Sequence, residues 1–163
     1  MQLTDGELRG AIHAQLRAHT VLTLATASAG IPHAVSLMYA EDEDFNICWL
    51  SDPDTRHSRH LESANRCAIT VATQYDDFRT IRGLQMVGSA GREPDPGDGL
   101  KLLVARHPFL QAFVAGKLAQ HSSRAAVYRF QPEMVTLIDN RRAFGFKQTL
   151  RLPTRPLGNR CCD

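Results

Sequence analysis

The chain has 163 residues, 43% of them hydrophobic, which suffices for one buried core and is typical of a single domain. Nineteen lysines and arginines against 17 acidic residues leave a formal net charge of +2, too balanced to indicate a nucleic-acid-binding stripe or a membrane-surface patch. The sequence contains no run of about 18 apolar residues and no signal-peptide pattern, so we expect a cytoplasmic protein that binds neither nucleic acid nor membrane.

The first predicted elements are a helix and a β-hairpin. Thr4 and Glu7 have the spacing of a capping box, and apolar residues then recur every four positions, which predicts an amphipathic helix over residues 5–18. Residues 21–27 and 31–40 are rich in β-branched and apolar side chains and are separated by a turn containing glycine. They therefore predict the two strands of a hairpin.

The next predicted strand ends at a segment rich in cations and hydroxyls. Residues 45–51 alternate with the period of a strand, which places Ser51 at the strand end, beside the start of a short helix. At a helix start, free backbone N–H groups and the positive end of the helix dipole attract anions. Thr55 and Ser58 can donate hydrogen bonds there and Arg56 can bind two oxygens, so this segment predicts a phosphate site.

A simpler interpretation of the same segment stays open. Asp52 or Asp54 could cap the helix, with the basic residues facing water. The choice between a solvated first turn and a phosphate site therefore depends on the flanking strands.

The remaining chain continues the alternation of strands with a few helices. Asn65 is a plausible C-terminal cap of the short helix. Further strands are predicted over residues 67–73, 80–90, 125–130 and 134–139, the last two separated by a turn at 131–133, and short helices over 100–106 and 109–118. This order predicts a mostly β protein with a few α-helices, a small and mostly antiparallel barrel of about six or seven strands. We expect one domain over residues 1–152 and a flexible tail over 153–163.

The four cysteines do not predict a disulfide framework or a metal site. Cys48 and Cys67 lie in strand-like runs and are expected to be small buried hydrophobes. Cys161 and Cys162 stand together in the tail without partners spaced along the chain, so we assign no metal.

Several segments in order resemble the pyridoxamine 5′-phosphate oxidase-like FMN-binding split-barrel proteins. The resemblance covers residues 20–91 and lies in the order of the pieces more than in any single motif. The pieces are Pro32-His33-Ala34-Val35-Ser36-Leu37, then Cys48-Trp49-Leu50-Ser51, then Thr55-Arg56-His57-Ser58 with Leu61 and Asn65, and finally Arg82-Gly83-Leu84-Gln85-Met86-Val87-Gly88.

The resemblance implies a homodimer of split barrels with two FMN molecules at the subunit interface. Carried over by position, it implies that Arg56, His57 and Ser58 take the FMN phosphate, with Thr55 and Ser51 assisting. It also implies that Val35, Ser36 and Leu37 run beside the isoalloxazine ring. We expect Gln85 to reach toward the cofactor from one subunit, and Lys147, in the segment 144–147, to lie near the ring as part of a lid or to pack on the barrel.

The sequence also departs from the vitamin-forming oxidase. That enzyme has a paired arginine and lysine at the phosphate turn, where this sequence has His57-Ser58. We therefore expect FMN binding but not pyridoxamine phosphate oxidation. No Ser-His-Asp or Cys-His spacing and no carboxylate pair in an apolar setting is discernible, so no catalytic side chain is identified. The predicted activity is an FMN-dependent oxidation or reduction of an unidentified small molecule, carried by the cofactor.

Two alternatives of other classes remain. Some relatives bind or degrade haem, and the chain offers possible iron ligands in His33, His57, His60, His107 and His121. The chain could also be a non-catalytic flavin-binding dimer. Reduced deazaflavin F420, a further cofactor of the family, would need a larger basic groove than the sequence indicates.

Overall fold

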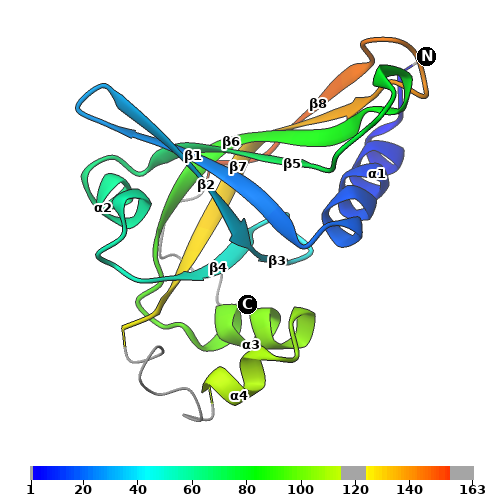
Figure 1. Ribbon diagram of the computed structural model, residues 1–163. Helices are drawn as coiled ribbons and strands as arrows, with labels where there is room; N and C mark the ends of the chain where they lie inside the picture. Colours follow the sequence, from blue (N-terminus) through cyan, green and yellow to red (C-terminus); the bar gives the residue numbers. More distant parts are fainter. Residues whose placement is uncertain (1, 115–123, 155–163) are drawn as a thin grey trace.

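A curled antiparallel sheet forms the body of the protein, and helices lie at its ends (Figure 1). The computed structural model describes residues 2–114 and 124–154. Its elements are α1 (Asp5–Ala18), β1 (Val21–Ser28), β2 (Ile31–Met38), β3 (Ala40–Glu41), β4 (Ile47–Ser51), α2 (Arg56–Ser63), β5 (Arg66–Ala72), the 3-10 helix η1 (Phe78–Thr80), β6 (Arg82–Arg92), α3 (Gly97–Arg106), α4 (Leu110–Val114), β7 (Ala126–Asp139) and β8 (Lys147–Arg151).

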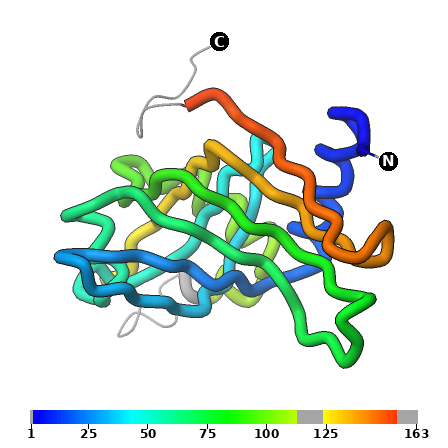
Figure 2. The backbone as a smooth tube through the Cα atoms, turned by 90° about the horizontal axis from the view of Figure 1, so that it is seen from above, coloured from blue at the N-terminus to red at the C-terminus, as the bar shows by residue number. Residues whose placement is uncertain are grey.

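The eight strands make one sheet with the order β2-β1-β5-β6-β7-β4-β3, and β8 pairs with the second half of β7. The sheet curls until β2, at one end of this order, comes into contact with β4 near the other end (Figures 1 and 2). The result is the split barrel that the sequence predicts, with mostly antiparallel β-structure and a few helices.

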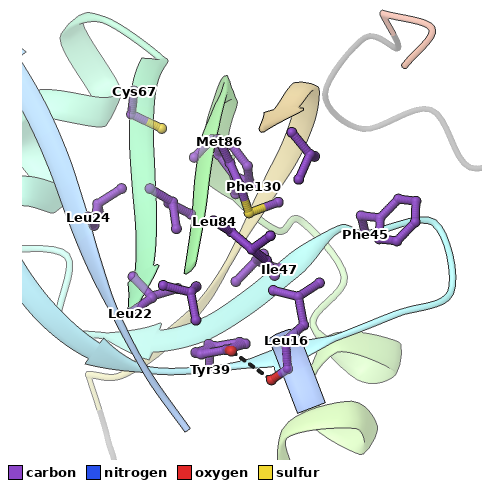
Figure 3. Packing of buried hydrophobic residues seen from close by; sticks show 14 of the residues in the cluster. Leu16, Leu22, Leu24, Tyr39, Phe45, Ile47, Cys67, Leu84, Met86 and Phe130 are labelled. Atoms are coloured by element: carbon purple, nitrogen blue, oxygen red, sulfur yellow. Dashed lines mark hydrogen bonds between the residues drawn. The ribbon is translucent and has the colours of Figure 1, made fainter. Parts of the chain in front are cut away.

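The barrel core is apolar and closed by the N-terminal helix. Figure 3 shows Leu22 from β1 and Leu84 and Met86 from β6 converging in this core, all at most 1% exposed. The Tyr39 hydroxyl donates a 2.7 Å hydrogen bond to the Leu16 carbonyl, which ties the end of α1 to the sheet. Burial of such side chains contributes roughly 1.5–3 kcal/mol each and dominates the stability of the fold.

Local chemistry explains several element boundaries. Thr4 and Glu7 form the predicted capping box at the start of α1, and the helix has the predicted bounds. The β1–β2 hairpin turns at Ala29 and Gly30, which both have positive φ, a conformation that glycine adopts without steric cost. The α3 helix ends at Arg106, with His107 as its C-cap residue, because Pro108 cannot continue it.

The structure differs from the predicted elements in three details. Residues 131–133 do not form a turn, because β7 continues through Pro132 at a register shift opposite Val87 and Gly88. A bulge tolerates a residue without an N–H donor, so a proline inside a strand does not end it. The cap after α2 is Ala64, not Asn65. The predicted strand 31–40 divides into β2 and β3, the predicted strands 125–130 and 134–139 join as β7, and β8 was not expected. The sheet of the described residues therefore has eight strands.

Cys48 and Cys67 are buried and free, as predicted, and burial raises the pKa of each thiol to about 12. Both thiols are therefore protonated at neutral pH and pack as small apolar side chains. Cys161 and Cys162 lie outside the residues that the structure describes. No helix in the described part of the chain combines the length and the apolar character needed to span a membrane.

Candidate functional site

Ser51 is the last residue of β4, and its side chain contacts the start of α2. The Ser51 hydroxyl oxygen lies 2.6 Å from His57 Nε2 and 3.3 Å from Thr55 Oγ1. Thr55 Oγ1 is 3.1 Å from His57 Nε2 and donates to Ser58 Oγ at 2.8 Å, while Ser58 donates to the Asp52 carbonyl at 3.0 Å. The predicted residues Ser51, Thr55, His57 and Ser58 thus form one connected group, called here the hydroxyl–imidazole cluster.

The N-terminus of α2 keeps its donors available. Thr55 is the N-cap residue, but its side chain makes no capping hydrogen bond, and the first turn contains no acidic residue. The backbone N–H groups of Arg56, His57 and Ser58 have no acceptor among the residues that the structure describes. These donors and the helix dipole together favour an anion at this position.

Arg56 adds a cation to this helix terminus. Its side chain is exposed, and within residues 2–114 and 124–154 it has no ion pair or hydrogen bond. A guanidinium without a carboxylate partner can bind two oxygens of an incoming anion without first breaking a contact.

The two nearby aspartates are held away from the helix start. Asp52 accepts a hydrogen bond from the Asp54 backbone N–H at 2.8 Å and lies 3.6 Å from Arg124. Asp54 forms ion pairs with Arg124 and, at 3.8 Å, with Arg59. Neither aspartate caps α2, so the structure does not have the carboxylate-capped first turn considered above.

His57 is the buried base of the cluster, with a side chain that is 5% exposed. Burial lowers its pKa, and the imidazoles of His33 and His60 lower it further. The His33 ring stacks parallel to His57 at 6.2 Å and contacts the edge of His60 at 5.9 Å. His57 is therefore neutral at pH 7, and its Nε2 can accept from Ser51 or donate to it, according to the tautomer.

An apolar pocket of about 380 Å³ lies beside the cluster, and Ser51 belongs to both. Two of the predicted ring-contact residues, Ser36 and Leu37, line it from β2. Further lining residues come from the α3–α4 region. The complete lining among described residues is Ser36, Leu37, Met38, Leu50, Ser51, Asp52, Leu103, His107, Phe109, Leu110 and Ala125.

Three predicted site residues lie apart from this pocket in the single chain. Val35 is half-buried and packs against the barrel core, on the opposite face of β2 from Ser36. Gln85 is exposed on the outer face of the sheet, and Lys147 is exposed at the start of β8. Figures 1 and 2 show β8 near the end of the molecule that carries α1, far from α2.

Gln85 belongs to an uncharged row that crosses the outer face. The cross-strand partners in this row are Ser36, Thr23, Thr70, Gln85, Thr136 and Thr149. The adjacent row is Ala34, Ala25, Ala68, Val87 and Met134, ending in Arg151 on β8. The row containing Gln85 reaches the pocket at Ser36, so this flat face of small side chains is continuous with the candidate site.

The sequence does not predict that α3 and α4 contribute to the pocket. Leu103 and Leu110 show only the helical apolar pattern of a packing face, and no spacing rule indicates that this face meets the ends of β2 and β4. His107 was considered only as an iron ligand. Among the described residues, no three His, Cys, Asp or Glu side chains are grouped so that they could hold a metal ion.

One protein-family model matches most of the chain. The family model described as pyridoxamine 5′-phosphate oxidase matches residues 8–139. No curated protein matches the chain.

Similar solved structures support the fold. A haem-binding protein from Mycobacterium smegmatis has 23% identity and a TM-score of 0.66, with 93% of this chain and 59% of that chain covered. A protein from Clostridium acetobutylicum related to general stress protein 26, of the pyridoxinephosphate oxidase family, has 14% identity and a TM-score of 0.67, covering 91% and 97%. Campylobacter jejuni ChuZ has 8% identity and a TM-score of 0.73, covering 92% and 61%.

Proposed function

The chain belongs to the pyridoxamine 5′-phosphate oxidase family, and from this premise we propose that it binds FMN, with the phosphate at the N-terminus of α2. The observation that carries the proposal is the uncapped start of α2 beside an apolar pocket, with Arg56 there having no partner among the described residues. A phosphate needs fixed donors and positive charge, and a flat ring needs an apolar slot. The two requirements are met side by side, at Ser51.

The phosphate would be held by donors from two sources. The first-turn backbone N–H groups of α2 and the Arg56 guanidinium supply charge-assisted hydrogen bonds. The hydroxyls of Ser51, Thr55 and Ser58 complete the cluster around His57. A buried neutral imidazole can donate one hydrogen bond to a phosphate oxygen without placing an unpaired charge in the protein.

The ring would lie in the pocket between β2 and the α3–α4 region. Leu37, Leu50 and Leu103 supply apolar surface there, and exposed backbone groups of β2 can bind the polar edge of the ring. When bound, FMN would supply hydride or electron transfer. The protein would orient the ring and exclude water, and we propose that a small molecule is oxidised or reduced at the open side of the ring.

We also propose that two copies assemble through the outer face of the sheet. Gln85 lies three strands from Ser36, roughly 14 Å at the usual strand spacing, so within one chain it cannot contact a ring beside Ser36. A second copy packed on this face could bring its own Gln85 to the ring. The row containing Gln85 is uncharged, and the adjacent row is apolar as far as Met134, so this face offers small side chains to an interface of about 800 Å² per partner.

The flavin proposal is tested by incubating the purified chain with excess FMN and then desalting it. We expect a retained flavin absorbance spectrum, and denaturation should release a molecule with the mass of FMN. Protein that stays colourless after this treatment contradicts the proposal. Retained FMN without turnover of NADH, NADPH or a panel of acceptors would make the chain a flavin-binding dimer with no redox activity.

The dimer proposal is tested by sedimentation. The wild type should sediment as a dimer, and Thr70→Arg, which places a cation at the centre of the face, should yield monomer. Ala14→Arg adds the same charge on the exposed side of α1 and should leave the dimer intact. A monomeric wild type, in the presence of FMN, contradicts the assembly.

The haem alternative has weaker support from the histidines themselves. His57 Nε2 lies 2.6 Å from Ser51, and His107 Nε2 lies 2.7 Å from the Tyr39 carbonyl. An iron would have to displace these contacts, whereas the ring nitrogens of His33 and the Nε2 of His60 have no hydrogen bond to other described residues. His121 lies outside the described residues. A titration with haem tests this alternative. We expect no Soret band that is lost when one histidine is replaced.

A further inference from the structure

His107 is the titratable side chain that the α3–α4 region contributes to the pocket lining. It follows the last residue of α3, and its backbone N–H donates to the Leu103 carbonyl at 2.8 Å. The side chain is 4% exposed, and its ring contacts that of Phe109 at 6.0 Å. His107 is thus fixed in position by the helix end, although it faces a cavity.

The hydrogen bond of His107 determines which ring nitrogen is free. Nε2 lies 2.7 Å from the carbonyl oxygen of Tyr39, and a carbonyl can only accept, so Nε2 carries the hydrogen. In the neutral ring, Nδ1 then carries a lone pair. Nδ1 has no hydrogen-bond partner among the residues that the structure describes. The pocket wall therefore holds a preset acceptor that calls for a donor from a ligand.

The sheet register gives the distance from this acceptor to the phosphate end. Ala40 pairs with Cys48, so Tyr39 and the His107 ring bonded to it lie near the level of Cys48 and Trp49. Ser51 lies two to three residues farther along β4, which corresponds to roughly 7–10 Å. A ligand with a phosphate at Ser51 would carry its ring system across this span.

We propose that His107 Nδ1 accepts a hydrogen bond from the N3–H group of the isoalloxazine ring and thereby positions the ring in the pocket. This inference rests on the proposed function, because it assumes that FMN occupies the pocket. Oxidised isoalloxazine has one ring N–H group, at N3, and its other polar ring atoms are acceptors. A hydrogen-bond acceptor on an otherwise apolar wall favours the edge of the ring that carries N3–H. A donor at the same position would instead favour an edge that carries an acceptor atom. His107 is a positioning residue in this account and takes no part in electron transfer.

The test compares FMN with N3-methyl-FMN, which lacks the donor but keeps the phosphate. Wild-type protein should bind FMN about tenfold more tightly than N3-methyl-FMN, the usual effect of one good hydrogen bond. In His107→Ala, which removes the acceptor and leaves space for the methyl group, the two affinities should agree within about twofold. His33→Phe, at the phosphate end, is the control and should change both affinities alike, so that their ratio is kept.

A spectroscopic measurement on wild-type protein makes the test independent of whether the variant folds. In protein labelled with 15N-histidine, FMN should shift the Nδ1 resonance of His107 toward the hydrogen-bonded position, and N3-methyl-FMN should not. Equal binding of the two flavins by wild type, or an unmoved Nδ1 resonance with FMN bound, overturns the inference and leaves FMN binding intact. If neither flavin binds, the proposed function fails and this inference fails with it.

Discussion

The N-termini of α1 and α2 solve the same physical problem in opposite ways. Both helices begin with unpaired backbone N–H groups and a positive dipole end. At α1, Thr4 and Glu7 close the terminus with a complete capping box, and Asp5 adds negative charge. At α2, the N-cap side chain of Thr55 turns to other partners, no acid stands in the first turn, and Arg56 adds positive charge.

The difference separates a terminus that stabilises the fold from one that is open to a ligand. Capping contributes about 1 kcal/mol, so leaving α2 uncapped costs stability within the chain. A bound phosphate would supply the missing acceptor. Because capping at each helix depends on single side chains, the difference can be tested by adding a cap to α2 and removing the cap from α1.

The largest expected effect comes from closing α2. Thr55→Asp supplies a capping carboxylate, which should raise the free energy of unfolding by about 0.5–1 kcal/mol. The same carboxylate occupies the donors and repels phosphate, so FMN affinity should fall on the order of 100-fold. Denaturant unfolding and fluorescence titration measure the two effects. Thr55→Val, which removes the hydroxyl without adding charge, should weaken FMN binding less, and equal losses would argue against the open terminus.

Removing the cation should have the next largest effect. Arg56→Ala should weaken FMN binding about 10- to 100-fold, because a hydrogen bond to a charged group contributes about 1.5–3 kcal/mol. Stability should be unchanged, since the exposed Arg56 has no partner among described residues. The control is Arg59→Ala. Arg59 lies three residues farther along the same helix and forms an ion pair with Asp54. A loss of the same size in the control would assign the effect to general positive charge.

The converse change at α1 should affect folding alone. Thr4→Ala removes the capping box and should lower the free energy of unfolding by about 1 kcal/mol. FMN affinity should stay within about twofold of wild type, since α1 lies far from α2 (Figure 1). A parallel loss of FMN affinity would show that the two termini are coupled through the fold.

The smallest effect concerns pH. The folded pKa of His57 lies below the ordinary value of about 6.5, so unfolding takes up a proton when the pH falls below that value. Stability without ligand should therefore decline as the pH is lowered from about 7 toward 5, and His57→Asn should make the decline shallower. His19, whose pKa is also lowered, keeps its own contribution, so the decline should not vanish. An unchanged slope in His57→Asn would mean that His57 is not the group that titrates.

The sequence was sufficient for most of the fold, because its signals are local. The capping box set the start of α1, and alternation in residues 45–51 correctly placed Trp49 and Ser51 on one face of β4. The barrel class followed from the order of strands. The turn predicted at Pro132 was wrong. A proline can end a strand or lie in a bulge, and which of the two occurs depends on the neighbouring strand, which the sequence alone does not reveal.

The site was predictable in part. Ser51, Thr55, His57 and Ser58 are close in sequence, so one strand end and one helix start bring them together. The pocket wall at His107 depends on packing between segments almost 70 residues apart, as the contact with Tyr39 shows. Such contacts leave no local pattern. Gln85 and Lys147 stay predictions, because the role of Gln85 depends on a second copy of the chain and Lys147 begins β8, which lies far from α2.

The central claim is that an open helix terminus binds a phosphate attached to a flat ring. Comparing the affinities of wild-type protein for FMN and for riboflavin tests it most directly, because the two ligands share the ring and differ in the phosphate. The account predicts that FMN binds at least about 100-fold more tightly, and that Arg56→Ala removes most of the difference. Equal affinity for the two flavins, or binding of neither, would contradict it.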